Sequence, residues 1–155
     1  MAKETNEDDS VSTTSPSDRS IKVMLLDDDE VNNFICSSII QKSIPESRVI
    51  SFLNGKQGLD YLESLLGKND YNLPDLIFVD INMPVMNGWE FLDRYKKIAN
   101  RFSKKIVLMM LTASISDKDV KKAKTYDIVD DYISKPLKQE ELTKVREDIL
   151  ARNEF

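Results

Sequence analysis

Short apolar runs that end at polar residues recur along the chain. The runs occupy residues 23–26, 76–79, 108–111 and 131–134, and they lead into Asp27, Asp80, Thr112 and Lys135, respectively. Runs of this length are typical of buried parallel strands, whose carboxyl ends form one edge of an open sheet. We therefore expect these four polar side chains to lie at the same edge.

Segments with helical spacing alternate with these runs. The first carries apolar residues at positions 31, 34, 35 and 39 and ends before Pro45; the last carries Leu142, Val145 and Ile149. A further strand is predicted at residues 48–53, followed by a turn at Asn54-Gly55. Five strands alternating with five helices predict an α/β fold, a doubly wound five-stranded parallel sheet with helices on both faces.

The two ends of the chain differ in composition. Residues 1–20 are rich in Ser, Thr, Asp and Glu and are predicted to form a flexible N-terminal tail, because they offer little apolar surface to bury. Residues 21–155 are predicted to form one folded domain. The fifth predicted helix ends this domain, so no separate output domain is expected.

Composition excludes several kinds of chemistry. The 155 residues include no histidine and one cysteine, Cys36, so no intrachain disulfide, Ser-His-Asp unit or typical zinc site can form. The formal net charge of −5 does not favour a nucleic-acid partner. No apolar stretch approaches the roughly 20 residues of a membrane span. We expect a cytoplasmic protein with Cys36 as a small buried hydrophobic residue.

The predicted sheet edge has the composition of a site for a divalent cation and a phosphoryl group. Asp28 and Asp80 are expected to bind Mg2+ directly and Asp27 through water, with the backbone carbonyl of Asn82 as a further ligand. The Thr112 hydroxyl and the Lys135 ammonium would bind phosphoryl oxygens. Singly, each residue has an ordinary structural alternative: a helix cap, a turn, a strand-end hydroxyl or a surface ammonium.

Four sequence motifs together resemble the receiver domains of two-component response regulators, the CheY-like family. They are Leu25-Leu26-Asp27-Asp28, Asp80-Ile81-Asn82-Met83-Pro84-Val85-Met86-Asn87-Gly88, Leu111-Thr112-Ala113 and Tyr132-Ile133-Ser134-Lys135-Pro136. They cover residues 21 to about 150 in the family's order. The acidic pair alone is a weak signal, whereas the block from Asp80 to Gly88 together with Lys135-Pro136 is specific.

The resemblance implies a role for each site residue. Asp80 would be the phosphoacceptor, Asp27 and Asp28 the Mg2+-binding pair, and Thr112 and Lys135 the groups that contact the phosphoryl oxygens. Thr112 and Tyr132 would form the switch that moves on activation, and the Lys135-Pro136 bond is often cis in this family. One departure is residues 127–130, where many receivers carry a small Gly-Ala pair.

The resemblance also implies partners. A stand-alone receiver would take its phosphoryl group from a histidine kinase or a histidine phosphotransfer protein, and signal to an unknown downstream protein. It would catalyse only its own phosphorylation and dephosphorylation. The protein would be a monomer, or a weak homodimer through the face of the fourth helix, fifth strand and fifth helix.

Three other functions fit the sequence less well. A haloacid-dehalogenase-like phosphatase usually places a second acid two residues after the nucleophile, where this chain has Asn82. A pseudo-receiver that is never phosphorylated would not need so complete a site. Nucleotide binding lacks both of the glycine-rich phosphate-binding motifs.

Overall fold

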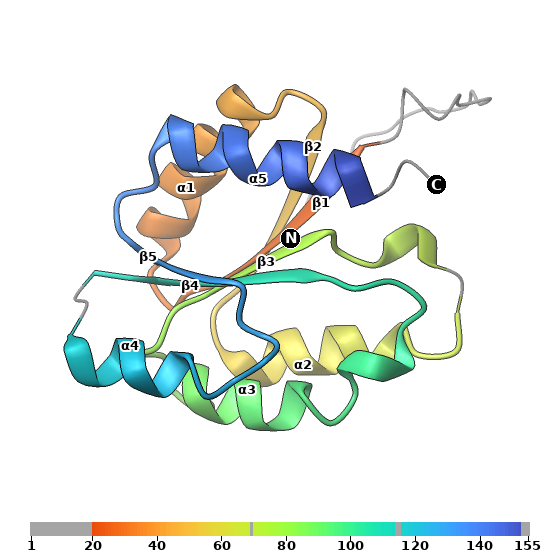
Figure 1. Ribbon diagram of the computed structural model, residues 1–155, viewed down its shortest axis with the longest axis vertical. Helices are drawn as coiled ribbons and strands as arrows, with labels where there is room; N and C mark the ends of the chain where they lie inside the picture. Colours follow the sequence, from red (N-terminus) through yellow and green to blue (C-terminus); the bar gives the residue numbers. More distant parts are fainter. Residues whose placement is uncertain (1–19, 69, 114–115, 153–155) are drawn as a thin grey trace.

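The predicted parallel sheet is present in the computed structural model, which describes residues 20–68, 70–113 and 116–152. The five strands are all parallel and lie in the order β2-β1-β3-β4-β5 (Figure 1). They are β1 (Ile21–Leu26), β2 (Ser47–Phe52), β3 (Leu76–Val79), β4 (Val107–Thr112) and β5 (Asp131–Ser134). The predicted tail lies outside the described residues, apart from Ser20, so the tail remains a prediction.

Helices cover both faces of the sheet (Figure 1). On one face lie α1 (Glu30–Ser43) and α5 (Gln139–Arg152); on the other lie α2 (Gly55–Ser64), α3 (Gly88–Tyr95) and α4 (Asp117–Ala123). Two 3-10 helices, Asp70–Asn72 and Ala99–Arg101, complete the connections. The connection between α2 and β3 contains the first of these and also Leu73, which is buried in the core.

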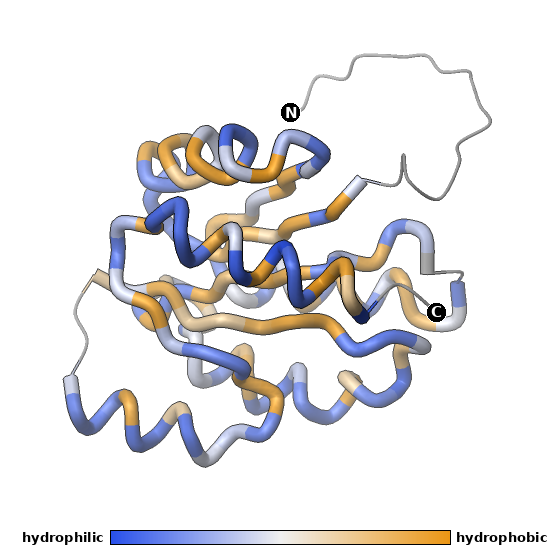
Figure 2. The backbone as a smooth tube through the Cα atoms, turned by 45° about the horizontal axis from the view of Figure 1, so that its top comes forward, coloured by the Kyte–Doolittle hydropathy of each residue, from blue (hydrophilic) through white to orange (hydrophobic). Residues whose placement is uncertain are grey.

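Successive strand residues point into two separate cores. In β1, Met24 and Leu26 face α2 and α3, whereas Val23 and Leu25 face α1 and α5. All four residues of β3 are buried, and Figure 2 shows the central strands as almost continuously hydrophobic while the helices alternate. Burial on both faces is what a continuous apolar run in a parallel strand predicts.

Strand register brings the site residues to one edge. Leu26 pairs with Val79, and Val79 pairs with Met110, so the residues that follow β1 and β3 emerge at the same level. The amide of Asp80 donates to the Leu26 carbonyl at 2.9 Å. Thr112 pairs with Ser134 at the end of β4 and β5, and its carbonyl accepts the Lys135 amide at 2.8 Å.

The inward face of α1 differs from the one that its apolar spacing suggests. Val31, Phe34 and Ile35 are 67%, 73% and 47% exposed, whereas Asn33 and Cys36 are buried. The helix has two apolar stripes, and the one containing Cys36 and Ile40 packs on the sheet. The other stripe leaves a set of apolar side chains on the surface.

The loop after β3 holds a β-branched residue in a left-handed conformation. Val85 has a φ of 67° and is 78% exposed. A β-branched side chain is disfavoured in this region of φ, and the exposed Val85 side chain gains no burial energy that would offset the cost. The position therefore carries a local conformational cost within two residues of Asn87, the N-cap of α3.

Replacing Val85 with Asn should raise the free energy of unfolding by about 0.5–1 kcal/mol, because Asn tolerates the left-handed region better. Urea unfolding of the two proteins measures the difference. Val85→Ile, which keeps the branched Cβ, is the matched control and should give no gain. A Val85→Asn protein no more stable than the Ile variant would contradict the assignment of strain.

Candidate functional site: an acidic cluster at the sheet edge

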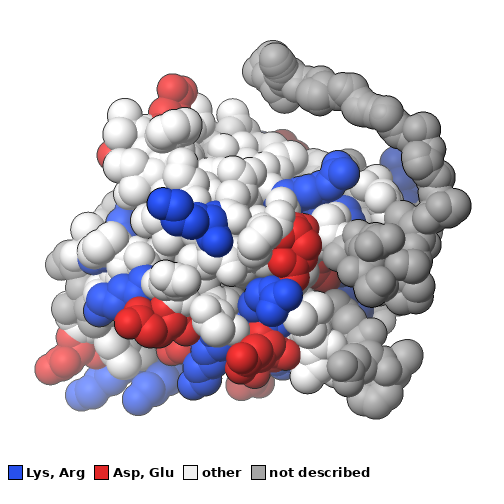
Figure 3. Space-filling model, turned by 90° about the horizontal axis from the view of Figure 1, so that it is seen from above, with Lys and Arg blue, Asp and Glu red and all other residues white. Residues whose placement is uncertain are grey.

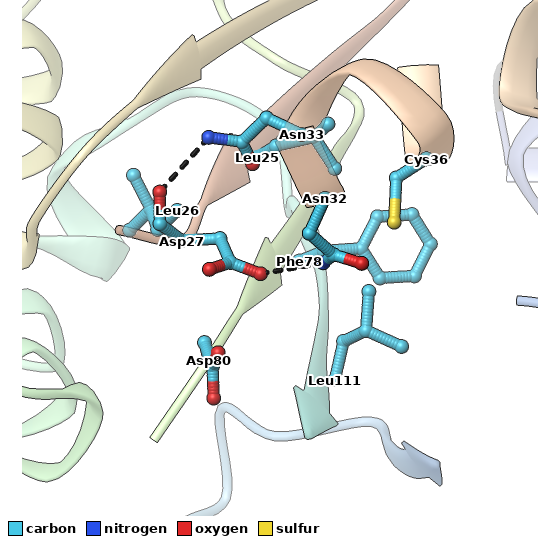
Figure 4. Close-up of a pocket in the computed structure, with 9 residues that line it drawn as sticks. All are labelled: Leu25, Leu26, Asp27, Asn32, Asn33, Cys36, Phe78, Asp80 and Leu111. Atoms are coloured by element: carbon cyan, nitrogen blue, oxygen red, sulfur yellow. Dashed lines mark hydrogen bonds between the residues drawn. The ribbon is translucent and has the colours of Figure 1, made fainter. Parts of the chain in front are cut away.

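Three carboxylates meet at the carboxyl edge of β1 and β3. Asp27 and Asp80 are the first residues after these strands, and both are buried, while Asp28 is exposed. One carboxylate oxygen from each lies within 4.8 Å of the others. Figure 4 shows Asp27 and Asp80 at the ends of neighbouring strands. The structure therefore brings together the three acids that the sequence predicted.

Lys135 bridges the two buried acids. Its Nζ donates to Asp27 Oδ2 at 2.7 Å and to Asp80 Oδ2 at 2.9 Å. The lysine follows β5, 55 positions beyond Asp80, and the Lys135-Pro136 peptide that follows it is cis. A single ammonium thus partly compensates two like charges that the fold places side by side.

The site shifts the pKa of both Asp80 and Lys135. Burial raises the pKa of Asp80, and the charge of Asp27 adds to this, although the hydrogen bond and charge of Lys135 oppose it. Burial alone would lower the pKa of Lys135, but its hydrogen bonds to Asp27 and Asp80 and their charges outweigh that effect and raise it. Both pKa shifts have the direction expected where two neighbouring carboxylates share a single ammonium.

The donor set fits a hard divalent cation. Three carboxylates and one ammonium leave a charge of about −2 at the site, and Mg2+ prefers oxygen ligands with room for water. The exposure of Asp28 leaves the cluster open on one side. Asp27, Asp28 and Asp80 would hold the ion. The predicted participation of the Asn82 carbonyl stays a prediction; its amide donates to Asp80 Oδ1 at 3.3 Å.

The loop from β3 to α3 is held close to the site by Gly88. A Cβ on this residue would lie 2.5 Å from the Asp80 carbonyl oxygen, so only glycine allows the helix to start so near. The Gly88 amide donates to the Ile81 carbonyl at 2.8 Å. Asn87 and Glu90 form a capping box that fixes the beginning of α3.

Thr112 and Tyr132 lie where the sequence places them, on neighbouring strands. Thr112 ends β4 and is buried. Tyr132 is half-buried against the core on the α2–α4 side, and its hydroxyl has no hydrogen-bond partner within residues 20–68, 70–113 and 116–152. Burial raises the pKa of Tyr132, and the charges of Asp119 in α4 and of Asp80 add to the rise. Their switching roles remain predictions.

The departure from the Gly-Ala pair has a packing explanation. Ile128 and Val129 pack against the core, and Asp130 accepts the Leu108 amide at 2.9 Å while donating its own amide to the Leu108 carbonyl. These larger residues therefore anchor the segment between α4 and β5 to β4.

An aromatic contact attaches the end of α4 to α3. Tyr126 stacks on Trp89 with ring centroids 6.0 Å apart, and Lys122 lies over the Trp89 ring at 4.6 Å. The Tyr126 hydroxyl donates to Asp93 Oδ1 at 2.8 Å. Within α4 itself only Ala123 is buried, so much of the helix's attachment lies at its carboxyl end.

Sequence reasoning missed two amides that bind Asp27. The Nδ2 of Asn32 donates to Asp27 Oδ2 at 2.6 Å, and the Nδ2 of Asn33 donates to the Asp27 carbonyl at 2.8 Å (Figure 4). The available signal was two consecutive amides in the first turn of the helix that follows the acidic run. Cys36 is buried beside them, as predicted, and burial raises the pKa of its thiol to about 11.

The chain belongs to the response regulator receiver domain family. The family model matches residues 23–147, which include every site residue described above. A probable transcriptional regulator ycf29 of Pyropia yezoensis is 35% identical over 135 residues, covering 86% of this chain and 55% of that protein. The nitrate/nitrite response regulator NarL of Escherichia coli K12 is 32% identical over 124 residues, covering 79% of this chain and 51% of that protein.

Solved structures agree with this assignment. A two-component response regulator from Cytophaga hutchinsonii superposes with a TM-score of 0.76 at 32% identity, covering 86% of this chain and 99% of that one. A two-component response regulator from Legionella pneumophila gives 0.71 at 28% identity, covering 85% and 99%. The CheY-like, flavodoxin-like fold class is confirmed.

The lengths of the relatives limit what can be transferred from them to this chain. The chain spans about half the length of the two curated relatives named above, so their whole-protein activities are not carried over. Among the described residues, no helix combines the length and apolar character needed to cross a bilayer.

Replacing Asp80 with Asn should raise the free energy of unfolding at neutral pH by about 1 kcal/mol, because it removes a buried charge that lies beside Asp27 and is only partly compensated by Lys135. The folded protein holds the Asp80 proton more tightly than the unfolded chain, so the wild type loses stability as pH rises through the raised pKa. The gain should therefore shrink towards zero below about pH 4. Urea unfolding across this range, without divalent ions, measures it, and a gain independent of pH would contradict the assigned cause.

Proposed function

We propose that this receiver domain acts as a response regulator whose Asp80 accepts a phosphoryl group from a phosphohistidine on a partner protein in a Mg2+-dependent reaction. The observation that carries the proposal is the convergence of Asp80 with Asp27, Asp28 and Lys135. Lys135 engages Oδ2 of Asp80, while Oδ1 accepts one long contact from the Asn82 amide. Oδ1 is the less engaged oxygen and is the better candidate nucleophile.

The transfer exchanges one covalent bond to phosphorus for another. The P–N bond to the partner's imidazole breaks as a P–O bond to Asp80 forms, and the leaving nitrogen takes up a proton. Mg2+, when bound, would neutralise charge on the phosphoryl oxygens and on the acids. Lys135 would exchange its contact with Asp80 for one with a phosphoryl oxygen, and the Thr112 hydroxyl would donate to another.

The resulting change is an added charge at the sheet edge. Thr112 and Tyr132 would respond, and the α4–β5–α5 face would change its contacts with a downstream protein. The near absence of buried residues in α4 supports this helix as the element that moves. The proposal includes no enzymatic turnover beyond the protein's own phosphorylation and dephosphorylation, and it takes the protein to be cytoplasmic.

The phosphohistidine is not supplied by these 155 residues, because they include no histidine. Two relatives are named as kinases: hybrid signal transduction histidine kinase L of Dictyostelium discoideum, 32% identical over 126 residues, and sensor histidine kinase CheAY of Helicobacter pylori, 34% identical over 134. They cover 80% and 86% of this chain, but the matched parts are only 7% and 15% of those proteins. These relatives support a partner of the histidine kinase or phosphotransfer type.

The exposed apolar stripe of α1 supports this helix as a docking surface for a partner protein beside the site. Val31, Phe34 and Ile35 lie on the helix that begins three residues after Asp27. Figure 3, which views the α1 and α5 side, shows charges of both signs interspersed with uncharged surface. Apolar side chains rimmed by polar ones are typical of protein-binding surfaces.

Incubation with acetyl phosphate and Mg2+ tests the chemistry directly. The wild type should gain the mass of one phosphoryl group, and the adduct should be absent with a chelator and in Asp80→Asn. Intact-mass spectrometry measures it. A wild type that gains no adduct, or an Asp80→Asn protein that gains the same one, would refute the proposal.

Replacing Phe34 with Ser tests the docking surface separately. Phosphotransfer from a phosphorylated histidine phosphotransfer protein should slow by about tenfold or more, as expected for loss of an exposed aromatic anchor. The rate with acetyl phosphate should not change. Leu150→Ser on α5, another exposed apolar position at 37%, is the control and should leave both rates intact. An equal loss with both donors would show damage to the site rather than to docking.

A further inference from the structure

The Asp27 carboxylate is held in place by neutral donors as well as by Lys135. Its Oδ1 accepts the Asp29 amide at 2.9 Å, and its Oδ2 accepts the Asn32 side-chain amide at 2.6 Å, drawn as a dashed line in Figure 4. Neutral donors orient a carboxylate without cancelling its charge. The negative charge of Asp27 therefore remains available to a cation.

The two carboxylate oxygens of Asp27 are not equally occupied. Each oxygen of an ionised carboxylate offers about two lone-pair positions. Asn32 and Lys135 both donate to Oδ2, at 2.6 and 2.7 Å, while the Asp29 amide donates to Oδ1. One lone pair of Oδ1 is thus left without a donor among these contacts, and it is the position available for a cation or its bound water.

We propose that Asn32 is a positioning residue for divalent cation binding, which keeps Oδ2 of Asp27 engaged and so presents Oδ1 to the ion. This inference rests on the proposed function of the acidic site. Lys135 is not dedicated to Asp27, because it also binds Asp80 and would exchange that second contact for one with a phosphoryl oxygen. The Asn32 amide has no such second role and can hold the carboxylate in both states.

The surrounding contacts separate this role from that of a structural amide. Asn33 is buried, and its Nδ2 binds the Asp27 main-chain carbonyl, so it supports the turn from β1 into α1. Asp29 caps the helix by accepting the amides of Val31 and Asn32. Removing the Asn32 side chain leaves both the cap and the turn in place. Its hydrogen bond to the carboxylate is what is lost.

The expected effect is about a tenfold loss of Mg2+ affinity, the lower end of what removing a hydrogen bond to a metal-binding side chain costs. We would replace Asn32 with Leu, which has the same branching at Cγ and no donor, and with Ala, in the full chain. Mn2+ binding, followed by electron paramagnetic resonance of the free ion, gives the affinity directly, and competition gives that for Mg2+.

A second measurement separates positioning from general damage. With acetyl phosphate, both variants should need about tenfold more Mg2+ for half-maximal Asp80 modification, while the rate at saturating Mg2+ stays close to that of the wild type. Glu46→Gln is the control, because it disrupts the 2.7 Å ion pair with Arg146, which links the amino end of β2 to α5. The control should change stability but not the Mg2+ requirement.

The outcomes are distinguishable. Unchanged ion affinity in both Asn32 variants overturns the inference and leaves the proposed function standing, as does an equal loss of affinity in Glu46→Gln. Failure of both Asn32 variants to fold without metal also overturns it, because the residue would then be holding the fold. A wild type that binds neither ion would instead refute the proposed function.

Discussion

The structure depends on an unfavourable interaction, the close approach of three carboxylates at the end of β1 and β3. Asp27 and Asp80 are both buried, and parallel pairing of Leu26 with Val79 places them at the same level of neighbouring strands. Lys135 compensates part of the repulsion, and the pKa of Asp80 remains raised by burial and by Asp27. The rest of the fold supplies the packing that holds this charge cluster together, and a bound divalent cation would relieve it.

The site could be predicted because each of its residues directly follows an apolar run. A run that is buried on both faces can only be an inner strand of a parallel sheet, and the next polar residue must then emerge at the carboxyl edge. This reasoning placed Asp27, Asp80 and Thr112 correctly. Lys135 also lies at this edge, although it follows β5, an edge strand in which only Ile133 is buried. The reasoning could not supply the contact of Lys135 with both acids, because that depends on strand order and on the path of the chain after β5.

Other features were hidden for physical reasons. The α1 sequence carries two apolar stripes, so its periodicity predicted a helix but did not select the stripe with Cys36 and Ile40 as the buried one. In the sequence, Asn32 looks like any polar residue in the first turn of a helix, and only the fold shows that its amide reaches Asp27. The left-handed backbone at Val85 is likewise invisible, since a β-branched residue does not predict it.

Structure determination with Mg2+ and beryllofluoride, a phosphoryl mimic, tests the central claim most directly. The account predicts beryllofluoride on Asp80 and one Mg2+ bound by Asp28 and Asp80, with ligand oxygens at about 2.0–2.1 Å. Asp27 would contact the ion directly or through water, and Lys135 would lie against a fluorine. An ion bound elsewhere, or beryllofluoride absent from Asp80 while the three acids stay together, would contradict it.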